Sequence, residues 1–162
     1  MMPKILTGLM VLSLVLAVLF GRERLLDLVF AKPVTASIDF RTLERSDRPN
    51  QFLVCPAGLC SAPVDLESPV FEMTATALRD RWLAMIKDQP RVETIAADPE
   101  NLLYHFVQRS YWMRFPDSIT VCFFDLADGK STLAIYSRSH YGRSDFGVNE
   151  NRIRHWLDLL SQ

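Results

Sequence analysis

Residues 136–149, with the sequence YSRSHYGRSDFGVN, are rich in hydrogen-bonding side chains. Two guanidinium groups, on Arg138 and Arg143, lie close together in this segment. Asp145 and Asn149 follow them at the expected start of a helix. Guanidinium groups and the free N–H groups of a helix N-terminus both bind carboxylates and phosphates. The segment therefore predicts a binding site for an anionic group.

The same segment also permits a catalytic and a purely structural interpretation. A hydrolase-like enzyme would use His140, beside Tyr141, or Asp145 as its base. Arg138 and Arg143 would then stabilise developing negative charge. In the structural interpretation, the glycines shape turns, Asp145 pairs with Arg138 or Arg143, and the other side chains face water. Because the chain has no G-x-S-x-G, phosphate-loop or metal-binding helix signature, a non-catalytic binding module is favoured, with the hydrolase as the alternative.

A shorter polar motif, RFPD, lies at residues 114–117. Its Pro116-Asp117 step is typical of a turn that enters a strand. We expect Asp117 to pair with Arg114 or with an arginine of residues 136–149. Arg114 and Asp117 are therefore further candidates for the binding site.

The motif CPAGLC brings two of the three cysteines, Cys55 and Cys60, close together. Pro56 and Gly58 favour a tight loop, and a disulfide that closes it would stabilise the fold by about 2 kcal/mol. Reduced structural cysteines, or a metal or redox role, remain alternatives. A thioredoxin-type motif has two intervening residues, whereas this one has four. A zinc site needs four ligands and no second cysteine pair exists, so we predict no metal and no cofactor.

The elements that must position these residues follow residue 74. Ala75, Leu78, Trp82 and Ile86 recur at helical spacing, with Thr74 as a possible cap and Pro90 at the end. Strands are predicted over 91–96, 102–108, 118–126 and 131–137, with an Asp-Gly hairpin turn before the last. A final helix carries a stripe of apolar residues, with Asn149 as its expected cap. This order predicts an α+β fold, with an antiparallel sheet of about four to five strands and two packing helices.

An N-terminal segment of different composition precedes this domain. Residues 5–20, ILTGLMVLSLVLAVLF, contain no charge, and the run extends to Gly21. As a helix, such a run is roughly 26 Å long, close to the ~30 Å hydrocarbon thickness of a membrane. No A-x-A cleavage site follows, which favours a retained transmembrane anchor over a cleaved signal. The flanking positive charges slightly favour a cytoplasmic body. The cysteines favour the extracytoplasmic (periplasmic) side, which we expect.

Charge and length limit the domain organisation and the partners. The chain has 162 residues, with 18 Lys+Arg against 19 Asp+Glu, so we expect no nucleic acid partner. The predicted organisation is an anchor or signal segment over 1–31, a linker over 32–49 and a single α+β domain over 50–162. The expected partners are a membrane, through the N-terminal helix, and an anionic small molecule, lipid head group or protein.

Four motifs resemble an uncharacterised bacterial and plastid family, known as domain of unknown function 1499. They are CPAGLCS at 55–61, SPVF at 68–71, RFPD at 114–117 and SRSHYGRSDFGVN at 137–149. The last motif is the most specific, and His140 falls at a variable position within it. The resemblance implies a domain that is often membrane-associated or exported, and it implies no activity.

Overall fold

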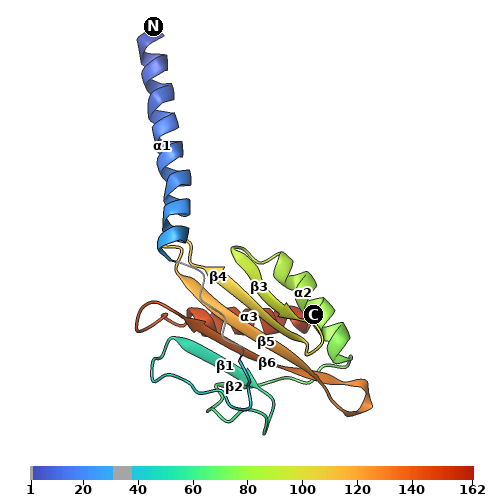
Figure 1. Ribbon diagram of the computed structural model, residues 1–162. Helices are drawn as coiled ribbons and strands as arrows, with labels where there is room; N and C mark the ends of the chain where they lie inside the picture. The colour runs from blue at the N-terminus through green and yellow to red at the C-terminus, as the bar shows by residue number, and fades with distance from the viewer. Residues whose placement is uncertain (1, 31–37) are drawn as a thin grey trace.

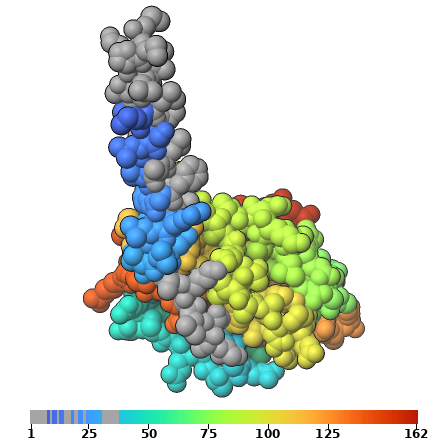
Figure 2. Space-filling view, turned by 45° about the horizontal axis from the view of Figure 1, so that its top comes forward, coloured from blue at the N-terminus to red at the C-terminus, as the bar shows by residue number. Residues whose placement is uncertain are grey.

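The computed structural model describes residues 2–30 and 38–162 (Figure 1). The first element, α1 (Met2–Val29), is a helix of 28 residues that projects away from the rest of the protein (Figures 1 and 2). Among the residues described, no helix is found that combines the length and the apolar character needed to cross a membrane.

The domain is built on a six-stranded sheet with the order β2-β1-β6-β5-β4-β3. The strands are β1 (Gln51–Cys55), β2 (Leu66–Glu67), β3 (Val92–Asp98), β4 (Leu103–Arg109), β5 (Pro116–Asp125) and β6 (Ser131–Ser139). The β1–β2 pair is parallel and the other four pairs are antiparallel. The α+β class is confirmed, but the sheet is mixed and larger than the predicted antiparallel one.

The two extra strands come from the region around the cysteine motif. In β1, residues 52–55 are all buried, although polar sequence precedes them. The chain then turns through the Cys55–Cys60 loop and returns beside β1 in the same direction, which makes the short β2 parallel. This parallel edge depends on a loop closure that local periodicity does not encode.

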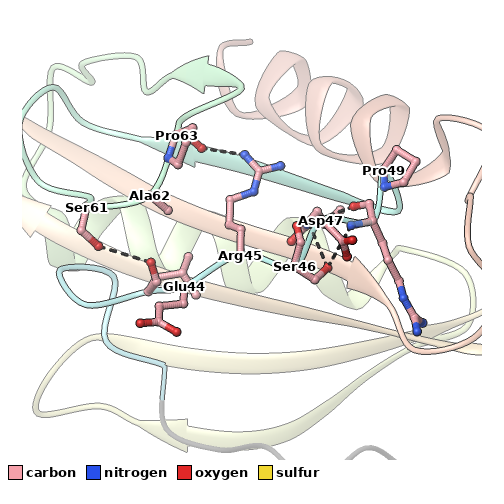
Figure 3. Close-up of a pocket in the computed structure, with 11 residues that line it drawn as sticks. Glu44, Arg45, Ser46, Asp47, Pro49, Ser61, Ala62 and Pro63 are labelled. Carbon is pink, nitrogen blue, oxygen red and sulfur yellow. Dashed lines mark hydrogen bonds between the residues drawn. The ribbon is translucent and has the colours of Figure 1, made fainter.

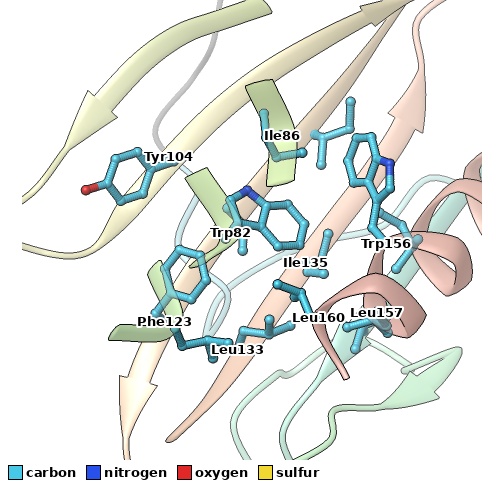
Figure 4. Close-up of a cluster of buried hydrophobic side chains, with 14 of the residues drawn as sticks. Trp82, Ile86, Tyr104, Phe123, Leu133, Ile135, Trp156, Leu157 and Leu160 are labelled. Carbon is cyan, nitrogen blue, oxygen red and sulfur yellow. The ribbon is translucent and has the colours of Figure 1, made fainter. Parts of the chain in front are cut away.

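Two helices, α2 (Ala75–Lys87) and α3 (Val148–Leu160), cover one face of the sheet. We call this the helix face. Its core is aromatic, and Figure 4 shows Trp82 and Trp156 among the aliphatic side chains of the strands and α3. The ring centroids of these tryptophans lie 5.7 Å apart in an edge-to-face arrangement. Close packing of such large rings fixes both helices on the sheet.

The opposite face of the sheet carries a second, smaller apolar cluster. Phe40 is buried there against residues of β1 and β6, among them Leu53 and Tyr136. Phe40 lies in the region predicted to be a linker, so part of that region packs on the domain. Cys122 of β5 is half-buried in the same cluster, and burial raises the pKa of its thiol to about 11. Strand β5 is therefore covered on both faces: Ile119, Val121 and Phe123 lie in the core under the helices, and Cys122 and Phe124 lie in the second cluster.

The local signals at the element ends are mostly confirmed. Thr74 caps α2, because its hydroxyl accepts a hydrogen bond from the N–H of Ala77 at 3.3 Å. Asp128 and Gly129 both have positive φ, 59° and 70°, as a tight hairpin turn between β5 and β6 requires. The prediction that Asn149 caps α3 is wrong, because Gly147 is the N-cap and Asn149 lies inside the first turn.

Candidate functional site

Three loops meet at the end of the sheet from which α1 departs, and we call this the loop end. They are residues 46–50 before β1, 110–115 between β4 and β5, and 140–147 between β6 and α3. The side-chain amide of Asn50 donates to the carbonyls of Ser139 at 3.3 Å and Gly142 at 3.0 Å. These bonds tie the first loop to the third across 92 residues of sequence.

Beneath the third loop, α3 carries a buried polar cluster that we call the α3 network. Its centre is Arg152, whose guanidinium donates to Asp117 at 2.6 Å, Asn149 at 2.7 Å and Ser137 at 2.9 Å. A fourth bond, from its Nε, reaches Gln108 of β4. The side chains of Arg152 and Asp117 are only 5% and 12% exposed. The network therefore joins α3 to strands β4, β5 and β6.

The partner of Asp117 corrects one prediction. Asp117 pairs with Arg152 rather than with Arg114 or an arginine of residues 136–149. Arg114 instead pairs with Asp27 of α1 at 3.1 Å, and Arg109 approaches the same carboxylate at 3.3 Å. The candidates Asp117 and Arg114 therefore hold elements together, Asp117 within the domain and Arg114 between the domain and α1.

Asp145 and Asn149 also have structural partners. The Asp145 carboxylate accepts hydrogen bonds from the backbone N–H of Gly147 at 3.2 Å and of Asn149 at 2.8 Å. The fully buried amide of Asn149 donates to Asp145 at 2.7 Å, to Ser139 at 3.1 Å and to the carbonyl of Asn50 at 3.1 Å. These contacts provide acceptors for N–H groups at the start of α3 and fix the end of the third loop.

The geometry gives no support to the hydrolase alternative. That alternative needs Asp145, Asp117 and a serine around one concave pocket. Asp117 lies in a buried ion pair, and Asp145 is occupied at the helix start. His140 instead contacts Ser118 on the other face of the sheet, with Nε2 3.0 Å from the hydroxyl. Burial and the neighbouring Arg138 lower the pKa of His140, against the opposing effect of Asp117.

We expect two histidines, the buried His105 and the half-buried His140, to make the stability of the domain depend on pH. Burial lowers the pKa of His105, which lies 2.9 Å from the Thr120 hydroxyl, and also that of His140. The unfolded chain therefore takes up protons near pH ~6.5 while the folded histidines remain neutral. We expect the free energy of unfolding to be fully retained above that pH and to fall as the pH drops below it. Urea denaturation at pH 8 and pH 5.5 measures this difference in the free energy of unfolding. In the double variant His105→Asn and His140→Asn the difference between the two pH values should be smaller. An equal difference in wild type and variant would contradict the assignment to these histidines.

Two arginines of the loop end are open to a ligand. Arg48 and Arg143 are exposed and line one hollow of about 550 Å³ together with Asp47 and Gly142. Within residues 2–30 and 38–162, neither guanidinium is engaged in an ion pair. The hollow is positively charged, because its lining holds the guanidinium groups of Arg48 and Arg143 and only one carboxylate, that of Asp47. Arg138 is also exposed but does not line it.

A larger hollow, of about 720 Å³, adjoins the first and shares Asp47 and Arg48 with it (Figure 3). Its own arginine, Arg45, is already engaged. Arg45 donates to the carbonyl of Pro63 at 2.6 Å and pairs with Asp65 at 2.8 Å. Arg48 is not among the residues that the sequence predicts for the site, because it lies in the predicted linker; the pairing of β1 with β6 and the Asn50 contacts bring it beside Arg143.

Cys55 and Cys60 form a disulfide, with their Cα atoms 6.2 Å apart. We expect reduction to lower the free energy of unfolding by about 2 kcal/mol, because the closed loop restricts the unfolded chain. Urea denaturation with and without dithiothreitol measures the loss. The variant Cys60→Ala lacks the bond and should not respond to the reductant. A wild-type chain equally indifferent to reductant would contradict the expected contribution.

The comparisons with known proteins give a family and little else. One solved structure that resembles the chain is the di-domain ARO/CYC BexL from the BE-7585A biosynthetic pathway. The match has 13% identity and a TM-score of 0.44, over 58% of this chain and 43% of that one. No curated protein matches. The model of the family described as protein of unknown function (DUF1499) matches residues 35–160, and the chain therefore belongs to that family.

Proposed function

We propose that this protein is a membrane-associated, non-catalytic accessory module that binds an anionic group at its loop end. One observation carries the proposal. Arg48 and Arg143 line a single hollow, both are exposed, and neither has an ion-pair partner in the described part of the chain. Unpaired guanidinium groups that share a concave surface are suited to a phosphate or a carboxylate.

The loop that carries Arg143 is held at both of its ends. Asn50 binds the carbonyl of Gly142, one residue before Arg143. Asp145 and Asn149 bind each other and fix the entry into α3 two residues after it. A guanidinium on such a supported loop loses less conformational entropy on binding than one on a free loop. Asp145 and the buried Asn149, which the sequence predicts as ligands, therefore position the loop that carries Arg143.

A titration with inorganic phosphate tests the binding proposal. The arginine side-chain signals of the full-length chain in detergent can be followed by NMR at constant ionic strength. We expect Arg48 and Arg143 to shift together, and Arg143→Gln to weaken phosphate binding by about tenfold, since a charge-assisted hydrogen bond contributes roughly 1.5–3 kcal/mol. Arg154→Gln is the matched control, because Arg154 is exposed but paired with Glu150. Equal phosphate affinity in wild type and Arg143→Gln would overturn the proposal.

Membrane association rests on α1 and on the sequence it contains. Residues 5–20 of this helix carry no charge, and α1 projects from the domain rather than packing over the sheet (Figure 1). Flotation of the full-length chain with phospholipid vesicles tests this part. We expect the chain to float and to resist extraction by alkaline carbonate. A chain that stays with the soluble fraction would refute membrane association and leave the phosphate test unaffected.

The Cys55–Cys60 disulfide supports an extracytoplasmic domain, because disulfides persist in oxidising compartments. Alkylation of free thiols in intact cells, followed by mass measurement, tests the location. We expect only Cys122 to be available for alkylation once the chain is denatured. Alkylation of all three cysteines would place the domain in a reducing compartment.

A further inference from the structure

We propose that the β4–β5 loop is a membrane-contact surface, in which Tyr111, Trp112 and Met113 enter the head-group region of the bilayer beside α1. The inference extends the proposed function and rests on its membrane association. We call these three residues the aromatic tip. The aromatic tip binds a lipid surface, and this contact involves neither the hollow lined by Arg48 and Arg143 nor the disulfide.

The aromatic tip exposes three large, mainly apolar side chains to solvent. Tyr111, Trp112 and Met113 are 62%, 69% and 47% exposed, and they are consecutive in the chain. The rings of Tyr111 and Trp112 lie 5.0 Å apart, edge to face. Large rings that are left in water at a loop tip indicate an interaction surface.

The position of the aromatic tip along the axis of α1 points to the head-group region of a bilayer. The uncharged run ends at Gly21, and Arg22 is the first charge after it. The Arg22 guanidinium lies 5.9 Å from the centroid of the Trp112 ring. Trp112 therefore stands at the level where the apolar part of α1 ends. Trp and Tyr are enriched at this level in membrane proteins, because their amphipathic rings fit the head-group region.

The base of α1 is fixed to the same loop, so the tip and the helix keep this relation. Asp27 binds Arg109 and Arg114, which flank the tip in sequence. Phe30, just after α1, packs against Phe115 with ring centroids 4.7 Å apart. In Figures 1 and 2 the helix leaves the domain beside this end of the sheet. A bilayer that receives α1 consequently meets the tip.

Tryptophan fluorescence gives a specific test, since the chain has three tryptophans and Trp82 and Trp156 are 0% and 1% exposed. The full-length chain is bound to phosphatidylcholine–phosphatidylglycerol vesicles that contain acyl chains brominated close to the head group. We expect these lipids to quench the Trp112 emission and to shield it from acrylamide. The variant Trp112→Phe should keep only the emission of the buried rings, which brominated lipid leaves unchanged.

A displaced tryptophan is the matched control. Leu126, 41% exposed, lies in the hairpin at the other end of β5, roughly 30 Å from the tip at ~3.3 Å per residue. In the background Trp112→Phe, the variant Leu126→Trp should be quenched by acrylamide and not by brominated lipid.

Each remaining outcome overturns the inference in a different way. If the chain floats with vesicles while Trp112 stays open to acrylamide, the tip faces water, although membrane association stands. If Trp112 is shielded from acrylamide but not quenched by brominated lipid, a protein surface covers the tip. If the chain does not float, membrane association and the tip fail together.

Discussion

Arg152→Met is expected to lower the free energy of unfolding by about 3–5 kcal/mol, which is the usual cost of removing one partner of a buried ion pair. The substitution leaves the Asp117 carboxylate buried without its counter-charge. It also removes the donor that Asn149 and Ser137 share. The loss should therefore loosen α3 from the strands as well as weaken the core.

Urea denaturation of three variants separates this effect from a general loss of charge. Arg154→Met removes an exposed arginine two positions along the same helix and should cost less than about 0.5 kcal/mol. The double variant Asp117→Leu with Arg152→Met removes both charges and should recover part of the stability. If the free energy of unfolding of Arg152→Met lies within about 1 kcal/mol of the wild-type value, the α3 network does not stabilise the fold as proposed.

Trp82→Ala is expected to cost a similar amount, about 3–5 kcal/mol, because it leaves a large cavity between α2 and the sheet. Trp82 is fully buried and its ring contacts those of Phe106, Phe123 and Trp156. Its Nε1–H has no hydrogen-bond partner among the described residues. The ring therefore stabilises the domain by packing alone.

The conservative variant tests that explanation. Trp82→Phe keeps an aromatic ring and removes the unpaired N–H, so we expect it to cost clearly less than Trp82→Ala. Both free energies come from urea denaturation monitored by circular dichroism. If Trp82→Phe is as destabilising as Trp82→Ala, the indole N–H has a partner in solution and the packing account is incomplete.

Much of the fold after residue 74 could be predicted because its periodicities are local. The spacing of the buried residues Ala75, Leu78, Trp82 and Ile86 identifies α2, and the Asp-Gly step identifies the β5–β6 hairpin. By contrast, β1 is short, follows polar sequence and pairs with β6, some 85 residues away. Such long-range pairing depends on tertiary contacts that a local pattern does not contain.

The sequence places only part of the candidate site, because the site also depends on contacts between distant segments. Arg143 was identified by residue type, and it lines a charged hollow. Its neighbour Arg48 and the ion pair of Asp117 with Arg152 were missed, since each joins segments far apart in sequence. One signal was available: Asn149 and Arg152 continue the helical stripe of Ile153 and Trp156. Polar residues on an apolar stripe indicate a buried network rather than ligand-binding side chains.

The sharing of one anion by Arg48 and Arg143 is tested most directly by a double-mutant cycle of phosphate affinity. The dissociation constant is measured for wild type, Arg48→Gln, Arg143→Gln and the double variant, at one ionic strength and with unchanged melting temperatures. We predict that each single variant loses about tenfold and that the double variant loses less than the product of the two, a coupling of about 0.5 kcal/mol or more. Unchanged affinity in either single variant, or losses that multiply without coupling, would contradict a shared anion site.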